Sequence, residues 1–303
     1  MSDQPIQLTI GHSPDPDDAF MWWPLGDAST AVPPTINTRG ISFTPIAEDI
    51  EKLNHRTIEI GDLDCTALSM HCYPHVKDRY ALTTCGASMG DGYGPKIVVG
   101  PDAPRDADLN WLARPDVRIA VPGLRTTAYL VLQLMLGARR TNVIAMPFDQ
   151  VIPRTLAGEA DAALIIHEAQ VSYPEEGLRL IVDLGAWWKT ETGLPLPLGA
   201  NAIRRDLDAR FAAGTMRRVS AVLKNSIEHA MAQRARGVDH ALAYARGIPA
   251  AQADEFIALY VNQLTIDAGE TGRKAVQELL DRGAAADLCP PPGRVEMVAP
   301  DAG

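Results

Sequence analysis

The chain has 303 residues, 46% of them hydrophobic and 22% charged, a balance typical of a folded globular protein rather than a disordered one. Its formal net charge of −10, with no run of basic residues, argues against nucleic-acid binding, because phosphate contacts need clustered lysine and arginine. The length favours two lobes over one compact core, and no apolar stretch is long enough to cross a bilayer.

The beginning of the chain and its cysteines predict a cytoplasmic protein. Met1 leads through polar residues into an alternating strand, without the basic and apolar segments of a signal peptide. The four cysteines form no CxxC pair and have no metal-type partners at zinc spacing, so we expect reduced thiols that mostly fill the core. These cysteines are Cys65, Cys72, Cys85 and Cys289.

Short apolar runs alternate with helical patterns along the first two hundred residues. Strands are predicted over 8–11, 41–46, 64–69, 80–84, 96–99, 117–121, 143–146, 162–167 and 178–184. Helices are predicted over 18–25, 48–57, 71–76, 126–138, 148–157 and 172–176, and the last third adds amphipathic helices over 220–236, 251–264 and 271–282. This βαβα rhythm predicts an α/β fold with mixed, mostly parallel sheets flanked by helices.

Two crossings of the chain divide it into lobes. The Pro- and Asp-rich stretch 100–115 and the Pro-rich stretch 195–199 mark the crossings, so we expect lobe one to comprise 1–100 plus 200–288 and lobe two 101–199. Four prolines predict an extended or disordered tail over 289–303. Hinged lobes of this kind hold a small ligand in the cleft between them.

The segment 11–18 passes from a strand through a tight turn into a helix. Loops at the carboxyl ends of strands carry ligands in open α/β sheets, which makes Ser13 a candidate for substrate binding. Asp17 or Asp18 can instead simply cap the helix. Acidic residues at a helix start are the ordinary arrangement, so we predict no metal site.

The segment 120–128 is a second strand–turn–helix junction. Gly123 permits the turn, and the free N–H groups at the helix start form a receptor for a carboxylate or phosphate. Arg125, Thr126, Thr127 and Ala128 are therefore candidate ligand contacts, with an ordinary threonine cap as the alternative.

Two further strand ends carry candidate residues. An apolar strand runs directly into His167, which places an imidazole at the cleft; histidine is the side chain best suited to accept a proton near neutral pH, although a structural role remains open. Ala67, Leu68 and Ser69 lie at the end of the third strand. No GxSxG motif accompanies Ser69, so a serine hydrolase is not predicted.

Several of these motifs together resemble one family. IIHE at 165–168, VDLGAWW at 182–188 and TGLPLPLG at 192–199 are its most specific segments, and SPDPDDAF, EDIEKLN, KDRYAL and VPGLRTTAYL also match. Over roughly residues 8–285 the chain resembles the 1,4-dihydroxy-6-naphthoate synthases of the futalosine route to menaquinone. The resemblance implies a two-lobed fold of the type II periplasmic-binding-protein class.

The resemblance also implies an activity. A lyase of this family converts cyclic dehypoxanthinylfutalosine to 1,4-dihydroxy-6-naphthoate without a metal or organic cofactor. His167 would be the proton acceptor, Ser69, Thr126 and Thr127 would hold the substrate, and Asn54 would lie nearby. The expected partner is this small anionic substrate, bound by a monomer or homodimer.

The chain departs from the family pattern at the ligand-facing motifs. The opening SPCPNDTF is SPDPDDAF here, which introduces Asp15 and Asp17, and Ala67 replaces a common lysine. Arg125 is a candidate to compensate for the lost cation. Two other functions stay open: a solute-binding protein that captures a small carboxylate without converting it, and a chorismate dehydratase-like enzyme.

Overall fold

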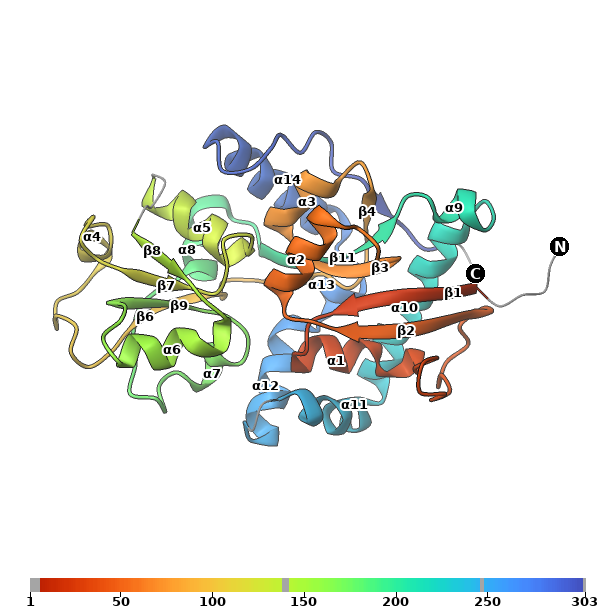
Figure 1. Cartoon of the computed structure of the whole chain (residues 1–303), viewed down its shortest axis with the longest axis horizontal. Helices are drawn as coiled ribbons and strands as arrows, with labels where there is room; N and C mark the ends of the chain where they lie inside the picture. The colour runs from red at the N-terminus through yellow and green to blue at the C-terminus, as the bar shows by residue number, and fades with distance from the viewer. Residues whose placement is uncertain (1–5, 138–141, 246–247, 302–303) are drawn as a thin grey trace.

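The computed structural model describes residues 6–137, 142–245 and 248–301. Its chain forms two β-sheets that lie side by side, each with its own helices (Figure 1). The first sheet, the centre of lobe one, has the strand order β12-β4-β11-β3-β1-β2, with β5 paired to β11. Its strands are β1 (Ile6–His12), β2 (Ile41–Ala47), β3 (Cys65–Ser69), β4 (Tyr80–Thr83), β5 (Ser88–Gly90), β11 (Leu196–Arg204) and β12 (Met297–Val298).

The second sheet, the centre of lobe two, has the order β10-β6-β9-β7-β8. Its strands are β6 (Lys96–Val99), β7 (Ile119–Val121), β8 (Val143–Ala145), β9 (Ala162–Ile165) and β10 (Arg179–Asp183). The helices of this lobe are α4 (Leu109–Leu112), α5 (Thr127–Leu136), α6 (Phe148–Leu156), α7 (Ala169–Ser172) and α8 (Leu184–Thr192). The two-lobed α/β architecture is therefore the predicted one.

The remaining helices surround the first sheet. They are α1 (Pro16–Trp22), α2 (Ile50–Glu59), α3 (Tyr73–Val76), α9 (Leu207–Arg210), α10 (Thr215–Ala232), α11 (Arg234–Ala241), α12 (Ala250–Tyr260), α13 (Gln263–Ile266) and α14 (Gly269–Ala285), with 3₁₀ turns at Trp23–Leu25, Met70–Cys72 and Leu242–Tyr244. The apolar stripe of α10, including Val222 and Ile227, packs against Phe20 and Met21 of α1. No helix within the described ranges is long and apolar enough to span a membrane.

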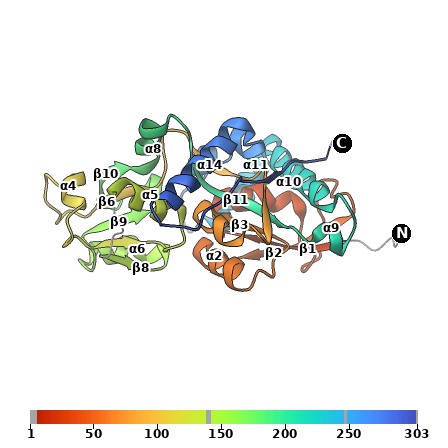
Figure 2. The ribbon, with the colours of Figure 1, turned by 90° about the horizontal axis from the view of Figure 1, so that it is seen from above.

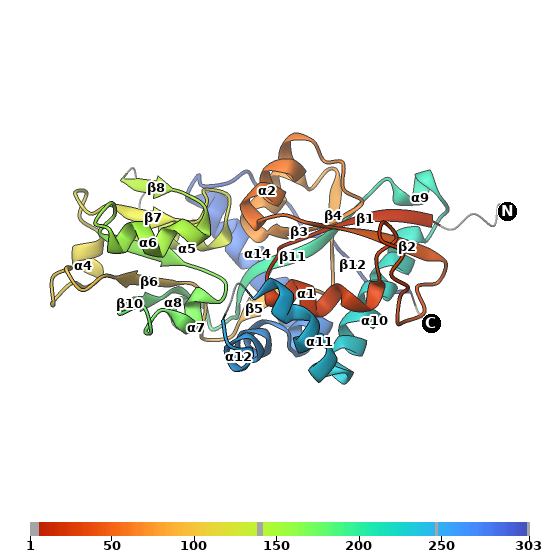
Figure 3. The same ribbon diagram turned by 60° about the horizontal axis from the view of Figure 1, so that its bottom comes forward.

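Two elements of the last third reach across to lobe two. Figure 2 shows α14 above β11, with one end close to α5. Figure 3 shows α12 beside α7, where the hydroxyl of Tyr260 lies 2.6 Å from the side-chain amide of Gln170. These contacts hold the C-terminal helices of lobe one against the far wall of the cleft.

The nine-residue strand β11 lies where the sequence indicates only a crossing between the lobes, at 195–199, and no strand. It runs antiparallel to β3, β4 and β5, so the sheets contain more antiparallel pairing than the βαβ rhythm predicts. The sheet accepts Pro197 because β11 pairs there only with β5, at an irregularity in the register. Similarly, β6 bonds into the second sheet, so the chain leaves the first sheet before residue 96 rather than near residue 100.

Three other local predictions differ from the structure. The predicted strand 162–167 ends at Ile165, and the predicted helix 172–176 is instead α7, three residues earlier. In the tail, Met297 and Val298 form a short strand parallel to β4. Residue 138, the predicted end of the helix that begins at 126, lies outside the described residues.

Candidate active site

The cleft between the lobes contains an inner cavity of about 110 Å³. Lobe one lines it with the loop after β1, the end of β3, parts of β5 and β11, and one face of α12, and lobe two with the start of α5 and the segment after β9. Most of the residues predicted from the sequence meet here: Ser13, Ala67, Leu68, Ser69, Thr126, Thr127, Ala128 and His167.

His167 lies two residues beyond the end of β9 in a turn that leads into α7. Its backbone has φ = 55°, a left-handed conformation that is uncommon for a residue with a side chain. The side chain is only 13% exposed, and the ring of Phe148 packs against it edge-on, with centroids 4.8 Å apart. The turn, rather than a continuing strand, therefore directs the imidazole to the cavity.

Asp15 pairs with His167 across the two lobes. Its Oδ2 lies 2.8 Å from Nδ1 of His167, and Ser13 Oγ donates to the same oxygen. Burial alone would lower the pKa of His167, but the charge and hydrogen bond of Asp15 more than offset it and raise that pKa to about 9. Nε2 of His167 finds no hydrogen-bond partner among the described residues, which leaves it available to a ligand.

Two more carboxyl groups, from the first turn of α1, line the cavity. Burial, followed by the charge of Asp15, raises the pKa of Asp17 to about 6. Burial and the charge of Asp17 raise the pKa of Asp18 well above its ordinary value, while Asp18 Oδ2 accepts the N–H of Ser13 at 2.7 Å. Within the described part of the chain, no group of three or more His, Cys, Asp or Glu side chains is placed to hold a metal ion.

The start of α5 offers backbone N–H groups rather than hydroxyls. Thr126 Oγ1 caps the helix by accepting from the N–H of Tyr129 at 3.2 Å and donates to the carbonyl of Gly123. Thr127 Oγ1 donates across the cleft to the carbonyl of Leu198 at 2.5 Å. The N–H groups of Thr127 and Ala128 lie in the first turn, where a helix supplies no acceptor, so they can receive an anionic group.

Asn54 supports Ser69 from behind the cavity. It is fully buried on α2, accepts the N–H of Ser69 at 2.9 Å and donates to Ser69 Oγ at 3.0 Å. Its amide also reaches the carbonyl of Arg125 at 3.4 Å. Asn54 therefore fixes the end of β3 relative to lobe two without lining the cavity itself.

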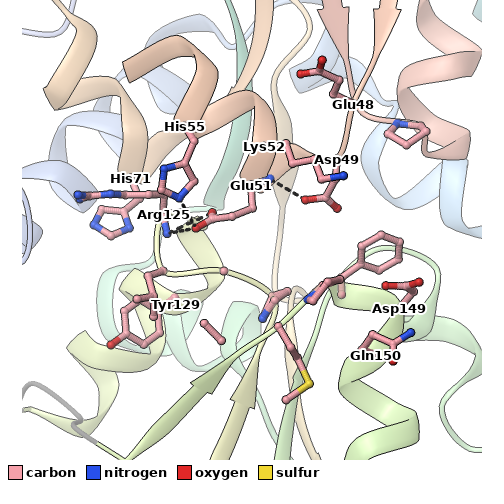
Figure 4. Close-up of a pocket in the computed structure, with 18 of the residues that line it drawn as sticks. Glu48, Asp49, Glu51, Lys52, His55, His71, Arg125, Tyr129, Asp149 and Gln150 are labelled. Atoms are coloured by element: carbon pink, nitrogen blue, oxygen red, sulfur yellow. Dashed lines mark hydrogen bonds and ion pairs between the residues drawn. The ribbon is translucent and has the colours of Figure 1, made fainter. Parts of the chain in front are cut away.

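Arg125 belongs to a separate outer chamber of about 1330 Å³ between α2 of lobe one and α5 and α6 of lobe two (Figure 4). Its guanidinium lies 3.1 Å from Nε2 of His75, and its backbone N–H donates to the Glu51 carboxylate at 2.9 Å. Burial and the charge of Arg125 lower the pKa of His75 to about 4, which leaves this ring neutral. The structure thus places Arg125 at the mouth of the cleft and not in the inner cavity.

Sequence reasoning missed several residues of the inner cavity. Gln170, Asn201, Phe256 and Tyr260 line it, and they come from α7, β11 and α12. Gln170 and Asn201 carried a local signal, since each lies two residues beyond a recognised segment, IIHE at 165–168 and TGLPLPLG at 192–199. The two aromatic residues belong to an amphipathic helix whose pattern is indistinguishable from ordinary core packing.

Comparisons with known proteins agree with this geometry. A family model described as menaquinone biosynthesis matches residues 8–285. The 1,4-dihydroxy-6-naphthoate synthase of Thermus thermophilus is 36% identical over 288 residues, covering 95% of this chain and 97% of that protein. A crystal structure of a protein from Archaeoglobus fulgidus is 35% identical, with a TM-score of 0.80 over 93% of this chain and 98% of that one.

More distant structures identify the fold. The alkanesulfonate-binding protein of Xanthomonas axonopodis, solved with bound MOPS, superposes with a TM-score of 0.68 over 96% of this chain and 97% of its own, at 14% identity. The two lobes thus have the periplasmic-binding-protein fold that the sequence implied. Together with the near full-length match to the Thermus protein, this shows that the chain belongs to the menaquinone biosynthesis family that includes the 1,4-dihydroxy-6-naphthoate synthases.

Proposed function

We propose that this protein is a 1,4-dihydroxy-6-naphthoate synthase, a carbon–carbon lyase that acts on cyclic dehypoxanthinylfutalosine, with His167 as its general base. The observation that carries the proposal is the His167–Asp15 pair, buried at the wall of a cavity that also contains the start of α5. In this cavity His167 can accept a proton while the N–H groups at the start of α5 hold an anion.

The carboxylate of the substrate binds at the start of α5. No lysine or arginine lines the inner cavity as the structure describes it, and Ala67 stands where the family commonly has lysine. The N–H groups of Thr127 and Ala128 and the hydroxyl of Ser69 remain as donors, assisted by the positive end of the helix dipole. This arrangement accounts for an anion site without a lysine or arginine.

His167 takes the proton that starts the reaction. Asp15 holds Nδ1, so Nε2 is the atom that meets the substrate. Removal of a proton is followed by cleavage of a carbon–carbon bond, and the aromatic ring that remains makes the step favourable. Only the neutral imidazole can act as a base, so kcat/KM rises with pH towards the pKa of about 9.

The alternative functions differ in what they require of His167. A solute-binding protein of this fold needs donors for an anion, which α5 provides, but it does not need a histidine in a left-handed turn and paired to a buried carboxylate. Perturbed titratable groups in a cleft are typical of catalysis. A chorismate dehydratase-like enzyme shares the fold, and substrate choice separates it from the synthase.

Incubation of the purified protein with cyclic dehypoxanthinylfutalosine, and separately with chorismate, tests the proposal. We expect 1,4-dihydroxy-6-naphthoate from the first substrate, detected by absorbance and mass spectrometry, and no turnover of chorismate. Tight binding of the futalosine derivative without product would contradict the lyase assignment and favour a binding protein. We place the reaction in the cytoplasm, which is supported by four free, buried cysteine thiols.

A further inference from the structure

Asn201, on β11, is a buried amide with only one half of its side chain satisfied by the protein. It is 1% exposed, and its Nδ2 donates to the carbonyl of Gly86 at 2.9 Å. Its Oδ1 finds no donor within the described ranges. A buried acceptor without a donor destabilises the folded state, so such atoms in native proteins usually meet water, an ion or a ligand.

The orientation of this amide is fixed from behind. Gly86 has φ = 77°, and a Cβ at this position would lie 2.5 Å from Nδ2 of Asn201. Thr83 Oγ1 shares its one proton between the backbone carbonyls of Cys85 at 2.7 Å and Asn201 at 3.0 Å, and so holds the strand at the same point. With Nδ2 committed to Gly86, the amide cannot turn over without losing that bond, and Oδ1 stays an acceptor.

The free oxygen belongs to the wall of the inner cavity. Asn201 is the direct cross-strand partner of Ala67, and paired residues project from the same face of a sheet. Both residues line the cavity, and so do Gly86, Ser88 and Asp17. Ser88 Oγ in turn donates to Asp17 Oδ2 at 3.4 Å. Lobe one thus contributes a wall rich in acceptors, whereas α5 of lobe two contributes N–H donors.

We propose that Asn201 is a specificity-determining residue whose Oδ1 accepts a hydrogen bond from a hydroxyl group of the ligand. The small side chain of Ala67 leaves room for that hydroxyl beside the amide. A ligand therefore binds with its carboxylate at the start of α5 and a hydroxyl at Asn201. The choice of ligand rests on the proposed function, and the subsite selects hydroxylated ring acids over the same acids without hydroxyls.

Two probes with one ring system and one carboxylate test this subsite. They are 1,4-dihydroxy-6-naphthoate, kept under nitrogen against oxidation, and naphthalene-2-carboxylate, which lacks both hydroxyls. Calorimetry should show that the wild-type protein binds the hydroxylated probe more tightly, because the unhydroxylated ring leaves buried acceptors unpaired. Asn201→Leu, of similar shape, should weaken binding of the hydroxylated probe about three- to tenfold without weakening binding of the other. Asn201→Ala serves the same purpose if leucine overfills the site.

Thr83→Val is the matched control. It removes the hydrogen bond to the backbone of Asn201 but leaves Oδ1 in place, so the ratio of the two affinities should stay at the wild-type value. Three results would overturn the proposal: an unchanged ratio of the two affinities in both Asn201 variants, an equal loss of the preference in Thr83→Val, or a wild-type protein that binds both probes equally. A clear Asn201-dependent preference in a protein that does not turn over the substrate would support this subsite and reject the lyase function alone.

Discussion

Replacing Asp15 by asparagine isolates the charge that acts on His167. Asparagine keeps the size of the side chain and an oxygen for Ser13, but it removes the carboxylate 2.8 Å from Nδ1. Asp15 raises the pKa of His167 from 6.5 to about 9, so at pH 7 only about one wild-type molecule in a hundred carries the neutral base. Without the carboxylate, burial is the largest remaining influence, and it lowers the pKa of His167 from its wild-type value.

The variant should therefore change the pH dependence and the maximal rate in different ways. The acid limb of kcat/KM should move to lower pH, because a larger share of the imidazole is then neutral at pH 7. The limiting rate at high pH should fall roughly 10- to 100-fold, because Nδ1 loses the partner that orients the ring. The assay is kcat/KM across about pH 5.5 to 10 at constant ionic strength.

Asp62→Asn provides the control, since Asp62 forms a surface ion pair with Arg56 outside the cavity and should leave the profile unchanged. An Asp15→Asn profile whose acid limb coincides with that of the wild type would refute the role of Asp15.

The pH dependence of the free energy of unfolding tests the same pair of residues. The raised pKa of His167 stabilises the folded protein below pH 6.5, and this stabilisation is lost as pH rises through about 9, so unfolding should become easier over that window only in the wild type.

Three further changes test other parts of the site. The pKa of Asp17 is raised to about 6, so its ionisation destabilises the folded state above that pH; Asp17→Asn should add about 1–3 kcal/mol in urea unfolding at pH 8 and almost nothing at pH 4, and an equal gain at both would be inconsistent. Asn54→Leu should lower the free energy of unfolding by about 1–3 kcal/mol and raise KM, because it leaves the N–H of Ser69 unpaired. Asn54→Asp keeps that acceptor and should raise KM less; equal KM values in the two variants would contradict the role of Asn54 in positioning Ser69. Arg125→Ala should raise KM by no more than about threefold and reduce its salt dependence, because the guanidinium lies in the outer chamber; a much larger rise would mean that it reaches the substrate.

The sequence predicted the parts of the site that lie within single strand–turn–helix junctions. Ser13 and Ser69 lie at the carboxyl ends of β1 and β3 in the first sheet, and Thr126 and His167 follow β7 and β9 in the second, so each sheet presents its strand ends to the cleft. Local patterns therefore identified the cavity wall and its candidate base. The left-handed turn at His167 lay beyond them, because no glycine or asparagine signals it.

The remaining features depend on contacts between residues distant in the chain. The Asp15–His167 pair joins segments about 150 positions apart, and the interpretation of Asp15 as a helix-start acid was sufficient on local grounds. The strand β11 was missed because Pro195, Pro197 and Gly199 are typical of a turn, and only the one-sided pairing at Pro197 makes a strand possible. Asn201 and Tyr260 entered the site through that strand and through the return of α12.

The comparison of wild type with His167→Asn tests the central claim most directly. Asparagine removes the base while leaving a small polar side chain, so the account predicts that Kd for cyclic dehypoxanthinylfutalosine changes little when it is measured by calorimetry above the pKa of about 9, where the wild-type imidazole is neutral. Formation of 1,4-dihydroxy-6-naphthoate in single turnover should fall by about 100-fold or more. Product formation at the wild-type rate in the variant would contradict the assignment of His167 as the base.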